Sequence, residues 1–430
     1  MGTQYKTVAF HTLGCKLNFS ETSTISRDFI KYGFKKVDYK DKADIYVLNT
    51  CSVTSNADKE ARRLIRSAKS RNRNASIVVI GCYAQLNPEE IAIMDDVDLV
   101  LGIEDKFQIV DYLDRLDLNK NPIVIHDEIN HINKFEPSYS LGERTRSYLK
   151  IQDGCDYTCS FCTIPLARGK SRSDNIKNTM KVAQKIANKG IKEIVLTGVN
   201  VGDFGNGSNE SLLDLLKHLD RLKGISRLRI SSIEPNLLSD EIIEFCNSSK
   251  LIMPHYHIPL QSGSDKILRL MRRRYDRLLY QTKINKIKSI NPDACIGADV
   301  IVGFPGETEE DFSDTYNFIN DLDVSYLHVF TYSERNNTSA IAFSNSVSKN
   351  ERSKRSKALH ILSDKKRIKF YSNYLKTNRN VLYENEMNGY LFGHTDNYIK
   401  VKVKGSKDHI NSVKKTNLFK INNKNVIGFI

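Results

Sequence analysis

Three cysteines near the middle of the chain lie within eight residues of one another. They are Cys155, Cys159 and Cys162, in segment 152–169. Thiolate sulfur is a good ligand for iron and zinc, so three thiolates on one tight loop can bind a single metal centre. A cubane [4Fe-4S] cluster has four irons and normally takes four thiolates. Three cysteines would therefore leave one iron open, and chemistry can take place there.

The first 125 residues alternate short β-rich runs with helical runs, which predicts a parallel sheet with helices on its faces. The expected elements are 7–12, 21–32, 45–49, 57–71, 77–80, 88–94 and 97–101. Three more cysteines, Cys15, Cys51 and Cys82, each come just after an expected strand. The carboxyl ends of parallel strands share one edge of a sheet, so these cysteines could converge.

Two observations bear on a second metal centre. Gly14 and Gly81 each precede a cysteine and would permit a sharp turn and a close approach of the backbone. Free cysteine is, however, often a small buried apolar residue. Both interpretations stay open at this point.

The middle of the chain, to about residue 335, predicts six β/α units and an open, incomplete barrel of the TIM type. The expected strands are 148–152, 193–197, 227–231, 255–259, 295–302 and 326–330. The segments that follow the strands are polar and rich in glycine, and they include Thr197, Gly198, Asn200, Glu234, Gln261 and Ser262. Such loops could bind a zwitterionic, ribose-bearing cofactor, although turns favour the same residue types.

The last quarter of the chain is basic. Segment 350–375 predicts a helix, and segment 380–430 predicts a small antiparallel β-barrel, a fold that commonly binds oligonucleotides. Four aromatic side chains there could stack on bases or fill the barrel core: Tyr390, Phe392, Tyr398 and Phe419.

The composition is that of an ordinary water-soluble protein, with 430 residues and a net charge of +14. The positive charge favours a polyanionic partner such as nucleic acid, although solvated surface lysines would give the same count. No apolar run suits a signal peptide or a membrane helix. We therefore expect a cytoplasmic protein with reduced thiols, in which Cys246 and Cys295 are core residues.

Several motifs resemble those of one enzyme family. The C-x3-C-x2-C loop with Phe161 before its last cysteine resembles the signature of radical S-adenosylmethionine enzymes. Leu-Gly-Cys, Asn-Thr-Cys and Gly-Cys-Tyr-Ala-Gln around the first three cysteines, and Ile-Pro-Leu-Gln-Ser-Gly-Ser further on, extend the likeness. Over essentially its full length the chain resembles the methylthiotransferases of that superfamily.

The resemblance implies two [4Fe-4S] clusters and S-adenosylmethionine. Cys155, Cys159 and Cys162 would hold the cluster that cleaves S-adenosylmethionine to a 5′-deoxyadenosyl radical. Cys15, Cys51 and Cys82 would hold an auxiliary cluster that carries the sulfur. The motif Thr-Leu-Gly-Cys-Lys-Leu-Asn most resembles enzymes that modify N6-threonylcarbamoyladenosine at carbon 2, beside the tRNA anticodon. The implied partners are tRNA, an electron donor such as flavodoxin or ferredoxin, and a sulfur source, with no membrane.

Further site residues are expected around these cofactors. The expected cofactor contacts are Phe161, Thr197, Gly198, Asn200, Glu234, Gln261, Ser262 and Asp299. Arg168, Arg172 and Arg273 are expected to hold phosphate or carboxylate groups of the substrate. No acid–base triad is expected, because acid–base residues cannot easily break an unactivated C–H bond.

Alternative functions also fit parts of the sequence. The substrate could be N6-isopentenyladenosine in tRNA or an aspartate of a ribosomal protein, and a zinc-bearing RNA-binding protein is a non-enzymatic alternative. One departure from the family pattern is Asn336-Asn337, where proline generally follows Tyr-Ser-Glu-Arg.

The expected domains are an auxiliary-cluster domain (1–125), a linker (126–146), a radical domain with its trailing basic helix (147–375) and an RNA-binding barrel resembling a TRAM domain (376–430).

Overall fold

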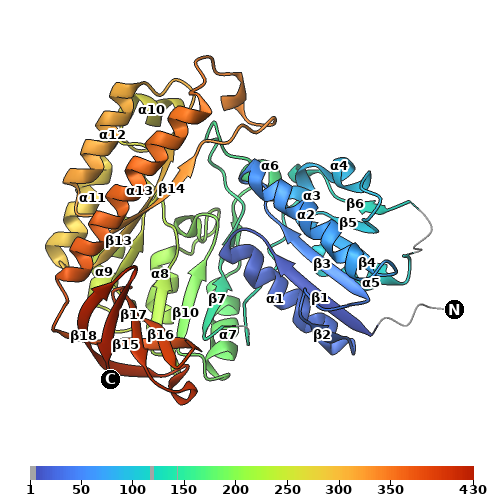
Figure 1. The fold of residues 1–430 in the computed structure, drawn as a ribbon, viewed down its shortest axis with the longest axis horizontal. Helices are drawn as coiled ribbons and strands as arrows, with labels where there is room; N and C mark the ends of the chain where they lie inside the picture. The colour runs from blue at the N-terminus through green and yellow to red at the C-terminus, as the bar shows by residue number, and fades with distance from the viewer. Residues whose placement is uncertain (1–5, 117–120, 143) are drawn as a thin grey trace. The chain divides into compact units, whose positions relative to one another are not determined.

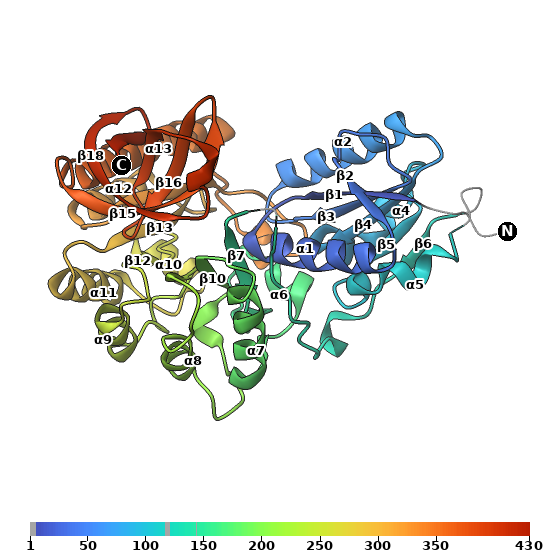
Figure 2. The ribbon, with the colours of Figure 1, turned by 90° about the horizontal axis from the view of Figure 1, so that it is seen from below.

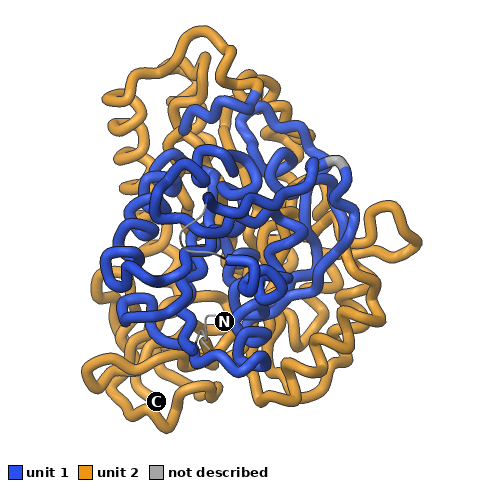
Figure 3. Tube along the Cα trace, turned by 90° about the vertical axis from the view of Figure 1, so that its right-hand side faces the viewer, with its two compact units in different colours: residues 1–140, 148–172, 333–338 blue, residues 141–147, 173–332, 339–430 orange. Residues whose placement is uncertain are grey.

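The computed structural model describes residues 6–116, 121–142 and 144–430. The described chain forms two compact units (Figure 3). The first unit consists of residues 1–140, 148–172 and 333–338, and the second of residues 141–147, 173–332 and 339–430. Glu143 of the expected linker lies outside the described residues, as do residues 1–5 and 117–120 of the first expected domain. The four-part division of the chain stays a prediction, and segment 148–172 folds with the first unit.

The first unit contains a six-stranded parallel sheet with the strand order β2-β1-β3-β4-β5-β6. The strands are β1 (Thr7–Thr12), β2 (Lys35–Val37), β3 (Ile45–Thr50), β4 (Ser76–Gly81), β5 (Leu99–Leu101) and β6 (Ile123–Ile125). Every residue of β3 and β4 is buried. Burial on both faces explains why these central strands are nearly continuous apolar runs.

Helices cover both faces of this sheet (Figure 2). They are α1 (Lys16–Lys31), α2 (Ser55–Arg71), α3 (Cys82–Leu86), α4 (Pro88–Ala92) and α5 (Ile109–Leu113). Leu64 and Ile65 of α2 pack with Val79 on one face. Phe29 of α1 packs with Ile80 on the other face, which α5 also covers. The two apolar clusters fix which way the side chains of each strand point, and hence the register of each strand in the sheet.

The second unit holds the predicted partial barrel. Its strands are β10 (Glu193–Thr197), β11 (Arg227–Ile230), β12 (His255–His257), β13 (Cys295–Val302) and β14 (Tyr326–Thr331), and β7 (Arg146–Lys150) is divided between the units. β10 pairs in parallel with β11, and β13 pairs in parallel with β12 and β14. Parallel bridges at Leu228–Ile252 and Ser232–His257 continue the wall from β11 to β12.

Helices alternate with these strands along the chain, which confirms the expected β/α order (Figure 1). They are α7 (Ile176–Ala187), α8 (Leu212–Leu219), α9 (Asp240–Ser248), α10 (Asp265–Leu270), α11 (Arg277–Ile290) and α12 (Glu309–Asp321). A long helix, α13 (Lys349–Ser372), follows β14. Among the described residues, none of the helices combines the length and the apolar composition that a membrane span requires.

The chain ends in a closed five-stranded barrel with the order β15-β16-β17-β19-β18. Its strands are β15 (Asn378–Met387), β16 (Tyr390–Thr395), β17 (Lys400–Lys404), β18 (Val413–Asn422) and β19 (Asn425–Phe429). The predicted antiparallel pairing needs one correction, because β17 and β19 run parallel while the other neighbouring strands are antiparallel. An odd number of strands cannot alternate in direction around a closed ring, so one parallel pair is unavoidable.

Two buried arginines of β11 fasten this small barrel to the larger one. Arg227 donates to the carbonyl oxygens of His394 (2.9 Å) and Asn380 (2.7 Å). Arg229 donates to the carbonyl of Thr395 (2.8 Å) and forms an ion pair with Glu193 (2.9 Å). Because both guanidinium groups are buried, these bonds make the two barrels parts of one unit.

Asp311 joins the start of α12 to α10. It forms a capping box with Thr308 and accepts hydrogen bonds from Ser264 (2.8 Å) and Lys266 (2.6 Å). Burial alone would raise the pKa of Asp311, but these hydrogen bonds outweigh it and lower the pKa to about 2.

We therefore predict that Asp311→Asn lowers the free energy of unfolding by about 1 kcal/mol at neutral pH. Because the folded-state pKa is depressed, the stabilisation is fully present above the unfolded-state pKa and is lost as the pH falls towards 2. Urea unfolding of both proteins across this range measures the difference. A difference that stays constant down to pH 2 would contradict the assignment.

Candidate functional site

Three cysteines of the first unit, Cys15, Cys51 and Cys82, each follow a strand of the sheet, as predicted. β1, β3 and β4 lie side by side, and their register pairs Thr12 with Asn49 and Thr50 with Gly81. Cys15 is the N-cap residue of α1, Cys51 directly follows β3, and Cys82 is the first residue of α3. All three cysteines thus lie at the carboxyl edge of the sheet, where α/β proteins bind ligands.

Hydrogen bonds tie the three cysteine-bearing turns together. The buried Asn18 amide donates to the carbonyl oxygens of Leu13 (2.9 Å) and Thr50 (2.8 Å), which precede the first two turns. The hydroxyl of Thr50 donates to the carbonyl of Ile80 (2.6 Å), just before the third turn. The side chains of Asn18 and Thr50 therefore fix the spacing of the turns.

The glycine before Cys15 shows how close two of these turns come. Gly14 has a φ of +93°, and a Cβ atom at Gly14 would lie 2.7 Å from the Cβ of Cys51. Gly81 has a φ of +95°, and its Cβ would lie 2.6 Å from the carbonyl oxygen of Thr50. Both positions therefore need glycine for conformation and for space.

The three thiols differ in exposure and influence one another. Cys15 is exposed, Cys51 is half-buried and Cys82 is buried. Burial, with a contribution from the nearby thiols of Cys82 and Cys15, raises the pKa of Cys51 to about 12, and burial also raises the pKa of Cys82. Thiols of this kind lose their protons when a positive metal centre binds.

The second cysteine set lies on the loop between β8 (Gln152–Asp153) and α6 (Ile164–Arg168). The amide of Cys155 donates to the carbonyl of Gly169 (3.0 Å) and closes the loop. Backbone amides of Tyr157 and Ile164 donate to the sulfurs of Cys155 (3.4 Å) and Cys162 (3.5 Å). Amide donors aimed at sulfur favour the thiolate form, so the loop fits a cluster held by three cysteines.

Arg168, which was expected to hold a substrate anion, is buried within the first unit. Its guanidinium donates to Glu21 (3.1 Å) and Asp153 (2.8 Å), and to the amide oxygen of Asn18 (2.6 Å). Asn18 also accepts a long hydrogen bond from the thiol of Cys15 (3.8 Å). Arg168 follows the second cysteine loop, so its side chain connects the two cysteine sets.

Two buried lysines also belong to this ion cluster. Lys106 pairs with Glu21 (2.6 Å), and Lys150 pairs with both Glu21 (3.1 Å) and Asp153 (2.9 Å). Burial would raise the pKa of Glu21, but Arg168 and the two lysines outweigh it and hold this pKa well below its ordinary value. Arg172 also pairs with Asp153 (3.4 Å), so the cations outnumber the two carboxylates and leave an excess of positive charge beside the thiols of Cys15 and Cys82.

The other two arginines expected to contact substrate also have protein partners. Arg172 donates to the carbonyl oxygens of Lys134 (2.9 Å) and Arg168 (2.6 Å). In the second unit, Arg273 forms an ion pair with Glu234. Substrate binding by these arginines stays a prediction that the contacts do not support.

The expected cofactor contacts fall in both units. Phe161 is half-buried on the cysteine loop of the first unit. Thr197, Gly198 and Asn200 lie where β10 ends, and the amide oxygen of Asn200 accepts a bond from the backbone of Glu234 (3.4 Å). The exits of β10 and β11 are therefore in contact, as the barrel prediction requires.

The remaining expected contacts lie near β12 and β13. Gln261 has a φ of +66° and bridges to Val300. The buried hydroxyl of Ser262 contacts that of Thr315 on α12 (3.2 Å). Asp299 is hydrogen-bonded to two histidines of the barrel wall, and these bonds outweigh burial and lower its pKa. Through its contact with Thr315, Ser262 packs against α12, one of the helices around the barrel.

Sequence reasoning missed several residues that hold the cysteine turns. The missed residues are Asn18, Glu21, Lys106, Lys150 and Arg335. Arg335 pairs with Asp58 (2.6 Å) and donates to the carbonyl of Ser52, which follows Cys51. Asn18 is the last residue of the motif Thr-Leu-Gly-Cys-Lys-Leu-Asn, and Arg335 is the last residue of Tyr-Ser-Glu-Arg. These two family motifs were therefore the sequence signals that could have identified both residues.

A turn forms after Tyr-Ser-Glu-Arg, although this chain has Asn336 where the family generally has proline. The amide of Thr338 donates to the carbonyl of Arg335 (3.0 Å), with exposed Asn336 and Asn337 between them. Asparagine is a common turn residue, so the departure from the family pattern fits this conformation.

The protein families that match this chain cover both cysteine sets. The chain matches the Uncharacterized protein family UPF0004 over residues 7–102 and the Radical SAM superfamily over residues 149–319. Among solved structures it is similar to TsrM, a radical S-adenosylmethionine methyltransferase from Kitasatospora setae. The TM-score is 0.57 at 12% identity, over 76% of this chain and 73% of TsrM. This likeness concerns the fold alone.

Curated relatives are similar over nearly the whole chain. The threonylcarbamoyladenosine tRNA methylthiotransferase MtaB of Bacillus subtilis is 41% identical over 96% of this chain and 94% of its own length. MtaB of Aquifex aeolicus is 39% identical over 93% of this chain and 97% of its own length. The tRNA-2-methylthio-N(6)-dimethylallyladenosine synthase of Endomicrobium trichonymphae is 32% identical over 93% and 94%.

The fold and the cysteine loop define a radical S-adenosylmethionine enzyme, a class that uses a [4Fe-4S] cluster and S-adenosylmethionine. With these relatives, the chain belongs to the methylthiotransferase family of that superfamily.

The ion cluster gives a direct stability prediction. Arg168→Met should lower the free energy of unfolding by about 3–5 kcal/mol, because it leaves buried Glu21 without its main partner. Arg172→Met is the control and should cost much less, since this guanidinium bonds mostly to carbonyl groups and its ion pair with Asp153 is long (3.4 Å). Anaerobic urea unfolding, followed by circular dichroism, measures both. Equal losses would show that the buried pair has no special role.

Proposed function

We propose that this protein methylthiolates N6-threonylcarbamoyladenosine at carbon 2, beside the anticodon of tRNA. The observation that carries the proposal is the likeness to threonylcarbamoyladenosine tRNA methylthiotransferases, at 41% and 39% identity over more than nine-tenths of the chain. The two cysteine sets of the first unit supply ligands of the kind this chemistry needs.

We assign one [4Fe-4S] cluster to each cysteine set. Cys155, Cys159 and Cys162 would hold the cluster that supplies the electron for cleaving S-adenosylmethionine. Cys15, Cys51 and Cys82 would hold the auxiliary cluster. The geometry supports the second assignment because hydrogen bonds join the three turns and the thiols influence one another.

The chain's own residues prepare both sites. Asn18 holds the turns of Cys15 and Cys51 at a fixed spacing and accepts a bond from Arg168. The excess positive charge of the ion cluster lowers the cost of collecting several thiolates in a buried place. Amide donors to Cys155 and Cys162 do the same on the second loop.

We assign tRNA binding partly to the C-terminal barrel. Tyr390 and Phe419 are exposed, and the ammonium of Lys402 lies 4.0 Å from the centre of the Tyr390 ring. An exposed ring beside a cation suits base stacking next to a phosphate. Tyr398 is different, because its ring stacks on His255 inside the second unit (4.0 Å).

We further propose a cytoplasmic location, a flavodoxin or ferredoxin as electron donor, and a separate sulfur source.

A second candidate substrate is N6-isopentenyladenosine in tRNA. The observation in its favour is the likeness to dimethylallyladenosine synthases at 32% identity. This identity is lower over a similar share of the chain. The threonylcarbamoyl substrate is therefore the better supported one.

The cluster assignment predicts metal content. The reconstituted protein should contain about eight irons per chain, and Cys15→Ala/Cys51→Ala/Cys82→Ala about four. This triple variant should still release 5′-deoxyadenosine from S-adenosylmethionine but attach no sulfur to tRNA. The double variant Cys246→Ala/Cys295→Ala is the control, because both residues are buried core cysteines, and it should keep about eight irons. Loss of all iron from the triple variant would contradict the assignment.

The substrate assignment predicts a modified nucleoside. Incubation of the reconstituted protein with S-adenosylmethionine, a reductant and threonylcarbamoylated tRNA should yield the 2-methylthio derivative, detected by mass spectrometry of nucleosides. An equal reaction containing isopentenylated tRNA is the matched control and should yield far less product. Product from the isopentenylated tRNA alone would favour the second candidate.

A further inference from the structure

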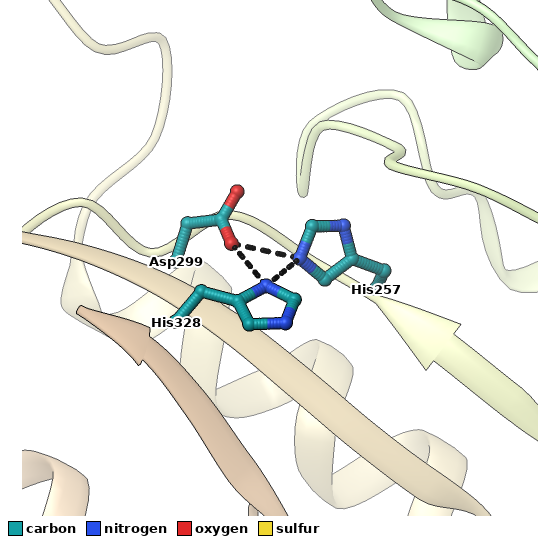
Figure 4. Close-up of side chains that lie close together, drawn as sticks. All are labelled: His257, Asp299 and His328. Carbon is teal, nitrogen blue, oxygen red and sulfur yellow. Dashed lines mark hydrogen bonds and ion pairs between the residues drawn. The ribbon is translucent and has the colours of Figure 1, made fainter. Parts of the chain in front are cut away.

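Two histidines and an aspartate lie together on the wall of the larger barrel, within the second unit (Figure 4). His257 is on β12, Asp299 on β13 and His328 on β14. These strands are hydrogen-bonded neighbours, and side chains at alternate positions of a strand share one face. The three residues therefore reach one place from three adjacent strands.

Their ligand atoms form a nearly equilateral triangle. Nε2 of His257 lies 2.8 Å from Oδ1 of Asp299, and Nδ1 of His328 lies 3.0 Å from the same oxygen. The two nitrogens are 3.2 Å apart. Adjacent ligands around a six-coordinate ion with bonds of about 2.1 Å are separated by about 3 Å. The triangle thus matches one face of such a coordination shell.

The outer contacts suit a metal ligand. The second ring nitrogen of His257, Nδ1, lies 2.6 Å from the hydroxyl of Ser232. If Nδ1 carries the proton and donates it to Ser232, Nε2 is left with a lone pair pointing at the triangle. Histidine ligands of metals characteristically donate their other N–H to a neighbour in this way.

The metal-free alternative is less favourable. Without an ion, the three contacts cannot all be hydrogen bonds of neutral rings, because each of the two nitrogens offers either one proton or one lone pair. If both nitrogens carry protons, the two N–H groups face each other across 3.2 Å, and if only one does, the other nitrogen turns its lone pair towards Asp299. A cation accepts all three lone pairs and removes this conflict.

The site has room for further ligands on one side. The side chains of His257 and Asp299 are 11% and 18% exposed, whereas that of His328 is 52% exposed. A bound ion would therefore be coordinated by the three side chains on the side of the sheet. Its other coordination positions would remain open to water or another oxygen donor. Sites of two histidines and one carboxylate with open positions are typical of Fe(II), Mn(II) or Zn(II).

We propose that His257, Asp299 and His328 bind one divalent first-row transition-metal ion, separate from the iron–sulfur clusters. This site goes beyond the proposed methylthiotransferase activity, which assigns no ion to these residues. Its chemistry is that of a Lewis acid with exchangeable positions for oxygen ligands.

The test uses Mn²⁺ and the reconstituted protein with oxidised clusters, which are diamagnetic. Mn²⁺ is chosen because it prefers nitrogen and oxygen ligands over thiolates. Loss of the free Mn²⁺ EPR signal during titration counts the bound ions. The wild-type protein should bind one tight Mn²⁺ per chain, and pulsed EPR should show nitrogen coupling from imidazole.

Substitutions test whether Mn²⁺ binds at these three residues. His257→Gln and His328→Gln should each weaken Mn²⁺ binding by about 100-fold and lose part of the nitrogen coupling. Ser232→Ala should weaken it by about 10-fold, as expected when an outer partner of a ligand is removed. His360→Gln, an exposed position on α13, is the control and should bind like the wild type.

The proposal is overturned by either of two results. One is a wild-type titration that matches that of His257→Gln/His328→Gln, when circular dichroism and iron content show both proteins to be folded and loaded. The other is tight Mn²⁺ binding that persists in that double variant. Both results are independent of tRNA modification, so they leave the proposed function untouched.

Discussion

The buried ion pair between Glu21 and Arg168 is the constraint on which the first unit depends. Both side chains are almost fully removed from water, where a single unpaired charge would cost several kcal/mol. Glu21 lies on the helix that follows Cys15, and Arg168 ends the helix that follows Cys162. The pair can form only when the two cysteine segments, more than a hundred residues apart in sequence, fold together. A buried ion pair therefore brings together the two segments that carry the cysteines.

Parallel pairing supplies the second half of this arrangement. Neighbouring parallel strands end at one edge of the sheet. The strand order β1-β3-β4 is therefore sufficient to bring Cys15, Cys51 and Cys82 to that edge. Glycine before two of the cysteines lets the turns approach, and the side chains of Asn18 and Thr50 hold them there. The sheet decides the general position of the three cysteines, while a few polar side chains decide the spacing of their turns.

Periodic features of the fold could be predicted from the sequence. The predicted bounds of β1 and β13 are those of the structure, because β-prone runs between turn residues give a clear pattern. Long-range polar partners could not be predicted, since nothing local in the sequence pairs Arg168 with Glu21 or Arg335 with Asp58. For the same reason the sequence suggests a substrate contact for Arg168, whose guanidinium bonds to Glu21 and Asp153 in the structure. The parallel pair in the small barrel was missed because sequence patterns give strands and not their directions around a ring.

The central proposal is that the first unit holds two clusters close together, one on each cysteine set. The most direct test is EPR spectroscopy of the fully reduced protein, because two nearby paramagnetic clusters split and broaden each other's signals. We expect the wild-type spectrum to show this interaction, and the spectra of proteins lacking either cysteine set to show one isolated cluster each. A wild-type spectrum equal to the sum of those two spectra, or containing a single cluster, would contradict the account.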